Sequence, residues 1–360
     1  LVQLFEQYVT PKLEATLEAD EDFLFFDGRW FLRELVPDLR LEYLLNLAEA
    51  MIYEGGQPLA AHEMLPRLEV DVGATTEVQL FALNHALDED ERFDNVSIGE
   101  EPVWFLRSLE PEAAFHRPAV LNPAFRAVGG EWIGLTMLDP VEELGDELDS
   151  IEGALSHDVE SVRFEVIFPH LYAGTMPATS QFLRMLPPVP SRHLPVTMID
   201  ARTGDRLDVW VLPHEHYVGG LDDWYKAVKM CVGGQVSVAP TEDPLTFTLS
   251  VVPARRRRSE WVRSASVAEG QVVVQMQKAS VAVRCDRDML LDVPDGEAIA
   301  SFMVESEQAQ ISLRAVVQTA FEELAKLNDR GIVHVKALYS LANLIRRTGA
   351  VPVFAELTRR

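Results

Sequence analysis

The 360-residue sequence has only two cysteines, Cys231 and Cys285, and no apolar run near the roughly 20 residues that span a bilayer. It also lacks a phosphate-binding glycine loop, a nucleophile elbow and a signal-like opening segment. Because two cysteines form neither a metal cluster nor a disulfide framework, we expect free buried thiols. These absences favour a cytoplasmic protein without membrane contact, and we expect no cofactor.

Basic residues are scarce in the first part of the chain. Residues 1–160 hold 9 Lys and Arg against 35 Asp and Glu, whereas residues 161–360 hold 23 against 22. Because neutralisation of phosphates by Lys and Arg dominates nucleic-acid affinity, the acidic half is poorly suited to binding DNA. We expect it to contact a basic protein partner, and we expect DNA contact through the C-terminal half.

An internal repeat organises the first third of the sequence. At an offset of 70 or 74 residues, eight positions of the first copy recur: Leu13/Leu83, Leu17/Leu87, Asp20/Asp90, Phe23/Phe93, Trp30/Trp104, Phe31/Phe105, Leu32/Leu106 and Arg33/Arg107. Apolar residues at helical spacing precede short runs rich in Phe and Trp, so each copy predicts a helix followed by a two-stranded hairpin. We expect the two tryptophans to occupy equivalent core positions.

The first copy, residues 1–37, is partial, and the second, residues 38–111, is complete. The complete copy predicts helices near 41–53, 58–65 and 75–87 before its hairpin. Together with Gly55-Gly56-x-Pro58-Leu59 and Asp90-x-x-Phe93, this order resembles the HARE-type winged helix of the bacterial RNA polymerase delta subunit. The resemblance implies a helix-turn-helix whose third helix reads DNA. That helix is acidic here, which favours contact with protein instead.

The remaining sequence predicts three further segments. Residues 112–160 have the composition of an acidic linker region. Residues 161–310 alternate in short strands, which indicates a β-rich barrel-like domain and loosely resembles the DNA-binding pseudobarrel of plant transcription factors and restriction-enzyme effector domains. Residues 311–360 predict a helix-turn-helix-like pair, followed by a strand at 351–357. The predicted fold class is α+β, with tandem winged-helix repeats followed by a β-rich barrel or sandwich domain and a C-terminal helical pair.

Basic residues in the C-terminal half are the candidate nucleic-acid contacts. They are the run Arg255, Arg256, Arg257 and Arg258, then Trp261, Arg263, Lys336, Arg346 and Arg347. The run offers phosphate contacts and Trp261 a stacking surface, although pairing of the run with the acidic half explains it equally well. Arg346 and Arg347 have an alternative role as cations at a helix C-terminus, worth roughly 0.3–1 kcal/mol.

His214-Glu215-His216 is the alternative site. Two histidines that alternate along a strand share a face, and His170 or Asp222 would have to supply a third metal ligand. A polar loop between strands is the preferred interpretation, so we assign no metal site and no catalytic residue from the sequence.

The leading hypothesis is a non-enzymatic winged-helix protein of transcription or another DNA-linked process. In this hypothesis, the C-terminal half contacts nucleic acid and the acidic half contacts protein. A metal-dependent hydrolase or nuclease that uses the His214/His216 region is one alternative, and a purely structural interaction module is another.

Overall fold

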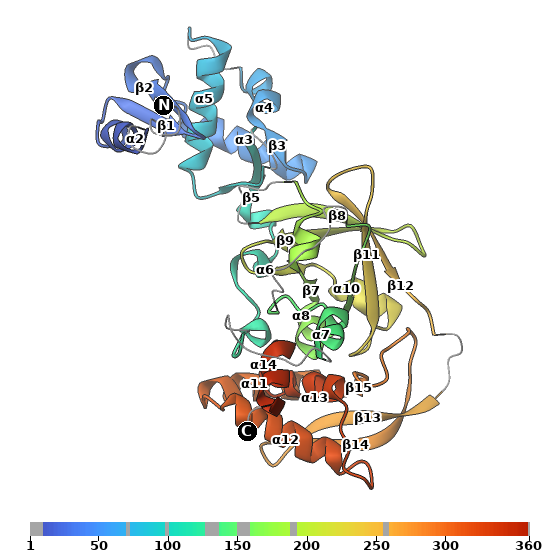
Figure 1. The fold of residues 1–360 in the computed structure, drawn as a ribbon. Coiled ribbons are helices and arrows are strands. Elements are labelled where there is room, and N and C mark those ends of the chain that lie inside the picture. The colour runs from blue at the N-terminus through green and yellow to red at the C-terminus, as the bar shows by residue number, and fades with distance from the viewer. Residues whose placement is uncertain are drawn as a thin grey trace. The chain divides into compact units, whose positions relative to one another are not determined.

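A computed structural model describes residues 10–69, 73–97, 101–126, 137–149, 159–187, 193–254 and 259–358 (Figure 1). The chain divides into two compact units. Unit 1 comprises Leu1–Glu110 with Pro188–Leu194, and unit 2 comprises Pro111–Pro187 with Pro195–Arg360. The fold is α+β, as predicted. Among the described helices, none combines the length and apolar character that crossing a bilayer requires.

Unit 1 contains two helix–hairpin elements. The first consists of α2 (Thr10–Glu18), β1 (Phe23–Phe26), β2 (Arg29–Leu32) and the 3-10 turn η1 (Arg33–Leu35). The second consists of α3 (Glu42–Gly55), β3 (Leu59–Ala60), α4 (Ala61–Leu68), α5 (Thr76–Asp88), β4 (Phe93–Asn95), β5 (Val103–Leu106) and η2 (Arg107–Leu109). The predicted helix at 58–65 therefore begins later, because Leu59 and Ala60 pair with β5.

The two hairpins have the same register at the predicted offsets. Phe23 pairs with Leu32 as Phe93 pairs with Leu106, and Phe25 pairs with Trp30 as Asn95 pairs with Trp104. Flanking backbone bonds also correspond: Phe23 N to Asp20 O and Phe93 N to Asp90 O, then Arg33 N to Asp22 O and Arg107 N to Arg92 O. This match supports the predicted internal repeat.

Burial differs between the two copies. Trp104 is 1% exposed and donates from Nε1 to Asn84 Oδ1 at 2.8 Å, whereas Trp30 is half-buried against the exposed ring of Phe25. The expectation that both tryptophans lie in a core is therefore wrong for Trp30. The reason is that α3 and α4 complete the packing of the second copy, and residues 10–40 hold no counterpart of these two helices.

A curved seven-stranded sheet forms the first part of unit 2. Its strand order is β6-β11-β12-β8-β9-β10-β7. Among the strand pairs whose register is described, β12 and β8 are parallel and the others are antiparallel. The sheet curls into a nearly closed barrel (Figure 1). The strands are β6 (Val162–Glu165), β7 (Thr175–Pro177), β8 (Leu194–Asp200), β9 (Arg206–Leu212), β10 (Tyr217–Gly219), β11 (Gln235–Pro240) and β12 (Thr246–Val251). Alternate valines of β11 point into the core, as the period-2 pattern predicts.

Short helices accompany this sheet. They are α6 (Glu112–Phe115), the 3-10 turn η3 (Ala119–Leu121), α7 (Leu138–Leu144), α8 (Phe168–Ala173), α9 (Ser180–Leu183) and α10 (Asp222–Val228). Of the expected 112–160 linker, residues 112–126 and 137–149 are therefore part of a packed unit.

The C-terminal part of unit 2 combines a second sheet with helices (Figure 1). Strands β13 (Ser259–Ala268), β14 (Gln271–Ser280) and β15 (Leu291–Asp292) contact helices α11 (Gly296–Gln308) and α12 (Leu313–Ala325), and the chain ends in α13 (Val335–Ala342) and α14 (Ala350–Thr358). The predicted helical pair corresponds to α12 and α13, but it is not a separate domain. The strand predicted at 351–357 is wrong, because these residues form α14.

Cys231 and Cys285 are joined by a disulfide bond across a separation of 54 residues, so the expectation of free thiols is wrong. Their segments also meet through an isolated backbone bridge between Gly234 and Cys285. Nothing in the spacing of two distant cysteines indicates this proximity, which arises from the tertiary fold.

Candidate functional site

The basic residues predicted to contact nucleic acid fall into three groups. Arg255–Arg258 lie outside the described residues. Trp261 and Arg263 lie on β13, on the hairpin that follows that run. Lys336, Arg346 and Arg347 are 5%, 6% and 1% exposed, respectively. The prediction for these last three is wrong, because their guanidinium and ammonium groups face protein partners and offer no surface to a phosphate.

Arg347 is the centre of a buried ion network in unit 2. Its Nη2 lies 2.6 Å from Asp146 Oδ1 and 2.7 Å from Glu147 Oε1. The Tyr339 hydroxyl donates to Asp146, and His170 Nε2 lies 3.1 Å from Glu147 Oε2. Burial opposes ionisation of Glu147, but Arg347 and His170 outweigh burial and lower its pKa. We refer to these five residues as the buried network. It joins α13 and the segment after it to α8 and to the segment after α7.

Lys336 is the buried centre of a second cluster. Its Nζ lies 2.6 Å from Glu143, 2.9 Å from Asp286 and 3.5 Å from Glu165. Burial of Lys336 opposes its charge, but Glu143 and Asp286 outweigh burial and raise its pKa. Lys336 therefore acts as a structural cation that joins α13 to β6 and to the loop before β15.

Glu165 in this cluster predicts a pH dependence of stability. Burial raises the pKa of Glu165 to about 7, Asp286 adds to the rise and Lys336 opposes it. The folded protein therefore holds a proton that the unfolded chain releases near pH 4.3, so this stabilising contribution is complete below about pH 4.3 and is lost as pH rises through 7. From pH 5 to pH 8, we expect the free energy of unfolding of the unmodified protein to fall by roughly 2–3 kcal/mol relative to that of Glu165→Gln, which has no carboxyl group to titrate at this position.

Urea unfolding at both pH values measures this difference, with Glu160→Gln as the control because Glu160 is an exposed glutamate just before the same strand. Parallel pH profiles for the unmodified protein and Glu165→Gln would contradict the assignment.

An open cleft of about 840 Å³ lies between the β13–β14 hairpin and helices α12 and α13. Its apolar lining consists of Trp261, Val262, Met276, Leu290, Leu324, Leu327, Ile332, Val333 and Ala337. Trp261 is 64% exposed, and Lys278 Nζ lies 5.6 Å from its ring centroid. Arg263 donates to the carbonyls of Arg287 and Asp288 at 2.6 Å each, and burial lowers its pKa. Of the sequence-predicted contacts that the structure describes, Trp261 is therefore the one with a largely exposed side chain.

The alternative site at His214 and His216 does not acquire the expected third ligand in the described part of the chain. Of the two candidates for that ligand, His170 is bonded within the buried network and Asp222 pairs with Lys226. Glu215 pairs with Arg117 at 2.9 Å. The two histidines lie in the turn between β9 and β10, as the polar-loop interpretation predicts.

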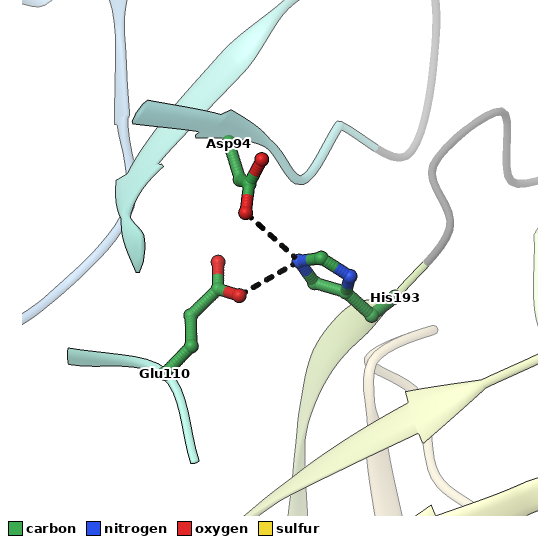
Figure 2. Close-up of side chains that lie close together, drawn as sticks. All are labelled: Asp94, Glu110 and His193. Carbon is green, nitrogen blue, oxygen red and sulfur yellow. Dashed lines mark ion pairs between the residues drawn. The ribbon is translucent and has the colours of Figure 1, made fainter. Parts of the chain in front are cut away.

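Asp94, Glu110 and His193 form the group of potential metal ligands that the described residues bring together (Figure 2). Asp94 is on β4, Glu110 follows η2, and His193 directly precedes β8. His193 Nε2 lies 2.8 Å from Glu110 Oε2 and 3.7 Å from Asp94 Oδ2. Arg107 donates to both oxygens of Asp94, at 2.6 and 3.0 Å. Burial raises the pKa of Glu110, and the neighbouring His193 opposes that rise.

Sequence reasoning missed this group, since its members are separated by up to about 100 residues and belong to no spaced motif. It also missed Lys278, whose position beside Trp261 depends on the pairing of β13 with β14.

Comparisons of this chain with models of protein families, with curated proteins and with solved structures found no match.

Proposed function

We propose that this protein is a non-enzymatic adaptor in transcription or another DNA-linked process. In this proposal, unit 2 contacts nucleic acid beside the open cleft, and unit 1 contacts a basic protein partner. The observation that carries the proposal is the exposed Trp261 ring, three residues after four consecutive arginines. An exposed aromatic ring next to a cationic run is typical of surfaces that stack bases and hold phosphates.

The nucleic-acid surface that we propose is smaller than the sequence predicts. Because Lys336, Arg346 and Arg347 are buried, the proposed surface consists of Arg255–Arg258, Trp261 and Lys278. Since β13 and β14 are antiparallel, Lys278 lies directly opposite Trp261 on the neighbouring strand. A base stacked on Trp261 would therefore have a cation within reach of its phosphate. This arrangement favours single-stranded over duplex nucleic acid, because stacking requires an unpaired base face.

We propose that unit 1 consists of tandem winged helices, one partial and one complete, similar to the HARE type. In the complete copy, the order is α3, β3, α4, α5, β4, β5, and β5 lies between β3 and β4 in one sheet. A helix-turn-helix with a strand pair after its third helix has this order. The corresponding reading helix is α5, and Glu77 and Asp88 on it disfavour contact with DNA phosphates. A basic protein surface is the partner that this charge fits.

The proposal predicts a specific loss of binding when Trp261 is removed. We expect Trp261→Ala in the full-length chain to weaken binding of a fluorescein-labelled single strand by about 5- to 150-fold, since base stacking on an aromatic ring contributes roughly 1–3 kcal/mol. Replacing Arg255–Arg258 with alanine should flatten the salt dependence, by up to about 3 in the slope of log affinity against log salt. Fluorescence anisotropy measures both effects, with single and duplex DNA of one sequence.

Tyr172→Ala is the matched control, because Tyr172 is also an exposed aromatic residue of unit 2, at 44%. Absence of binding at low salt would end the nucleic-acid proposal. Equal losses in Trp261→Ala and Tyr172→Ala would show that the β13 surface has no special role. An unchanged salt slope after replacement of the four arginines would instead assign them to the protein's own carboxylates.

A further inference from the structure

The internal repeat singles out two carboxylates that the helix–hairpin fold does not require. At the predicted offsets, Asp94 corresponds to Leu24 and Glu110 corresponds to Val36, which are both apolar. The equivalence extends to backbone bonds, since Glu110 N donates to Arg107 O as Val36 N donates to Arg33 O. The same local structure therefore forms with or without acids at these positions. Their presence in the second copy calls for an explanation other than folding of the hairpin.

Glu110 is the more informative of the two. Its side chain is fully buried, and Oε1 accepts no hydrogen bond from the described residues. A buried carboxylate is strongly disfavoured unless a cation or hydrogen-bond donors compensate it. His193 lies beside Oε2, but Oε1 needs a further partner. The Glu110 side chain points toward Asp94 and His193 (Figure 2).

The spacing of the three side chains matches the first coordination sphere of a small divalent ion. Ligands about 2.1 Å from a metal lie about 3.0 Å apart at right angles and about 3.4 Å apart at tetrahedral angles. The separations from His193 Nε2 are 2.8 Å to Glu110 and 3.7 Å to Asp94, which bracket these values. One oxygen or nitrogen from each residue lies within 4.8 Å of the others, so an ion can contact all three after small rotations.

Arg107 supports this arrangement as a positioning residue. Its bidentate contact holds the plane of the Asp94 carboxylate, in the way that outer hydrogen bonds orient metal-binding carboxylates. It also offsets one negative charge, so the two carboxylates and the arginine together carry a net charge of −1. That charge still favours a divalent cation.

We propose that Asp94, Glu110 and His193 bind one Zn²⁺ ion through one carboxylate oxygen each and His193 Nε2. An imidazole nitrogen combined with two carboxylates favours Zn²⁺ over Mg²⁺ and Ca²⁺, which take all-oxygen sites. Three protein ligands leave at least one position for water or for a donor from a partner. The site is independent of the nucleic-acid surface proposed above, because none of its residues belongs to that surface.

Isothermal titration of ZnCl₂ into the full-length chain, previously stripped of metal with a chelator, tests the proposal. We expect one ion per chain, and we expect His193→Gln and Glu110→Gln each to weaken binding by about 100-fold or more, because removal of even an outer partner weakens metal sites 10- to 100-fold. His62→Gln is the matched control, since His62 pairs with the single carboxylate of Glu101 on an exposed surface of the same unit. Its affinity for Zn²⁺ should equal that of the unmodified protein.

A second measurement separates loss of the site from loss of the fold. Zn²⁺ should raise the unfolding temperature of the unmodified protein and of His62→Gln, and should leave that of His193→Gln unchanged. Circular dichroism establishes that each variant is folded before titration. Binding that is absent, or weak and equal in all four proteins, would overturn the proposal and would leave His193 as the side-chain partner of a buried Glu110.

Discussion

Replacement of Arg347 with alanine is expected to lower the free energy of unfolding of unit 2 by about 3–5 kcal/mol. The side chains of Arg347, Asp146 and Glu147 are at most 1% exposed, so the variant leaves two carboxylates in the interior without their shared cation. Truncation of a large, fully buried side chain adds a cavity to this loss. Urea unfolding measures the change, and hydrogen exchange with mass spectrometry assigns each transition to its unit.

Two further variants define the cause of that loss. Arg314→Ala is the control, because Arg314 is an exposed arginine on α12 of the same unit and should change stability by less than about 0.5 kcal/mol. Arg347→Lys keeps the charge but lacks the planar fork that contacts Asp146 and Glu147 together, so we expect a smaller but measurable loss. If Arg347→Ala is as stable as Arg314→Ala, the buried network does not stabilise the fold.

The error over Arg347 shows which information the sequence lacks. Two adjacent arginines at the C-terminus of a predicted helix are normally solvated, and the 142–152 segment has the composition of an exposed acidic linker. The structure joins these two segments across about 200 residues, which makes each the partner of the other. Neither propensity nor local charge encodes such a pairing, because burial depends on which surfaces meet. The same reason explains the misassignment of Lys336.

Local structure could be predicted where the signal lies within a few residues. Asp27 and Gly28 both adopt positive φ, at 48° and 73°, as a tight hairpin turn requires, and an Asp-Gly pair is a strong sequence signal for such a turn. Alternating valines predicted β11 for a similar reason. The start of α4 was misplaced, because the pairing of Leu59 with Trp104 is a tertiary contact. Short strands of this kind leave no periodic pattern to detect.

The Asp94–Glu110–His193 group could be predicted from the sequence only in part. No spacing motif connects residues on a hairpin, after a 3-10 turn and before a distant strand. The repeat did contain a usable signal, since aligning the two copies places Leu24 and Val36 opposite the two acids. Exchange of an apolar residue for an acid within a duplicated fold points to a role other than folding. Only the structure could add His193, which lies about 80 residues further along the chain.

The largest effect expected in unit 1 is at Trp104. Trp104→Ala should lower the free energy of unfolding of this unit by about 3–5 kcal/mol, because the ring is 1% exposed and packs against Phe26, whose ring centroid is 6.1 Å away. Trp104→Phe keeps most of the ring but removes the donor to Asn84. Its smaller decrease in the free energy of unfolding therefore measures the contribution of that hydrogen bond and of the missing ring volume.

Trp30→Ala provides the internal comparison, because Trp30 has the same hairpin register but is only half-buried. The stabilisation from burying a side chain scales with the apolar area that it removes from water. Trp30→Ala should therefore lower the free energy of unfolding clearly less than Trp104→Ala does. Urea unfolding with hydrogen exchange measures all three variants. Equal losses at the two tryptophans would contradict the inference that α3 and α4 give the second copy its core. A loss below about 1 kcal/mol at Trp104 would mean that its ring is not packed as described, since fully buried Trp→Ala substitutions are expected to cost several times more.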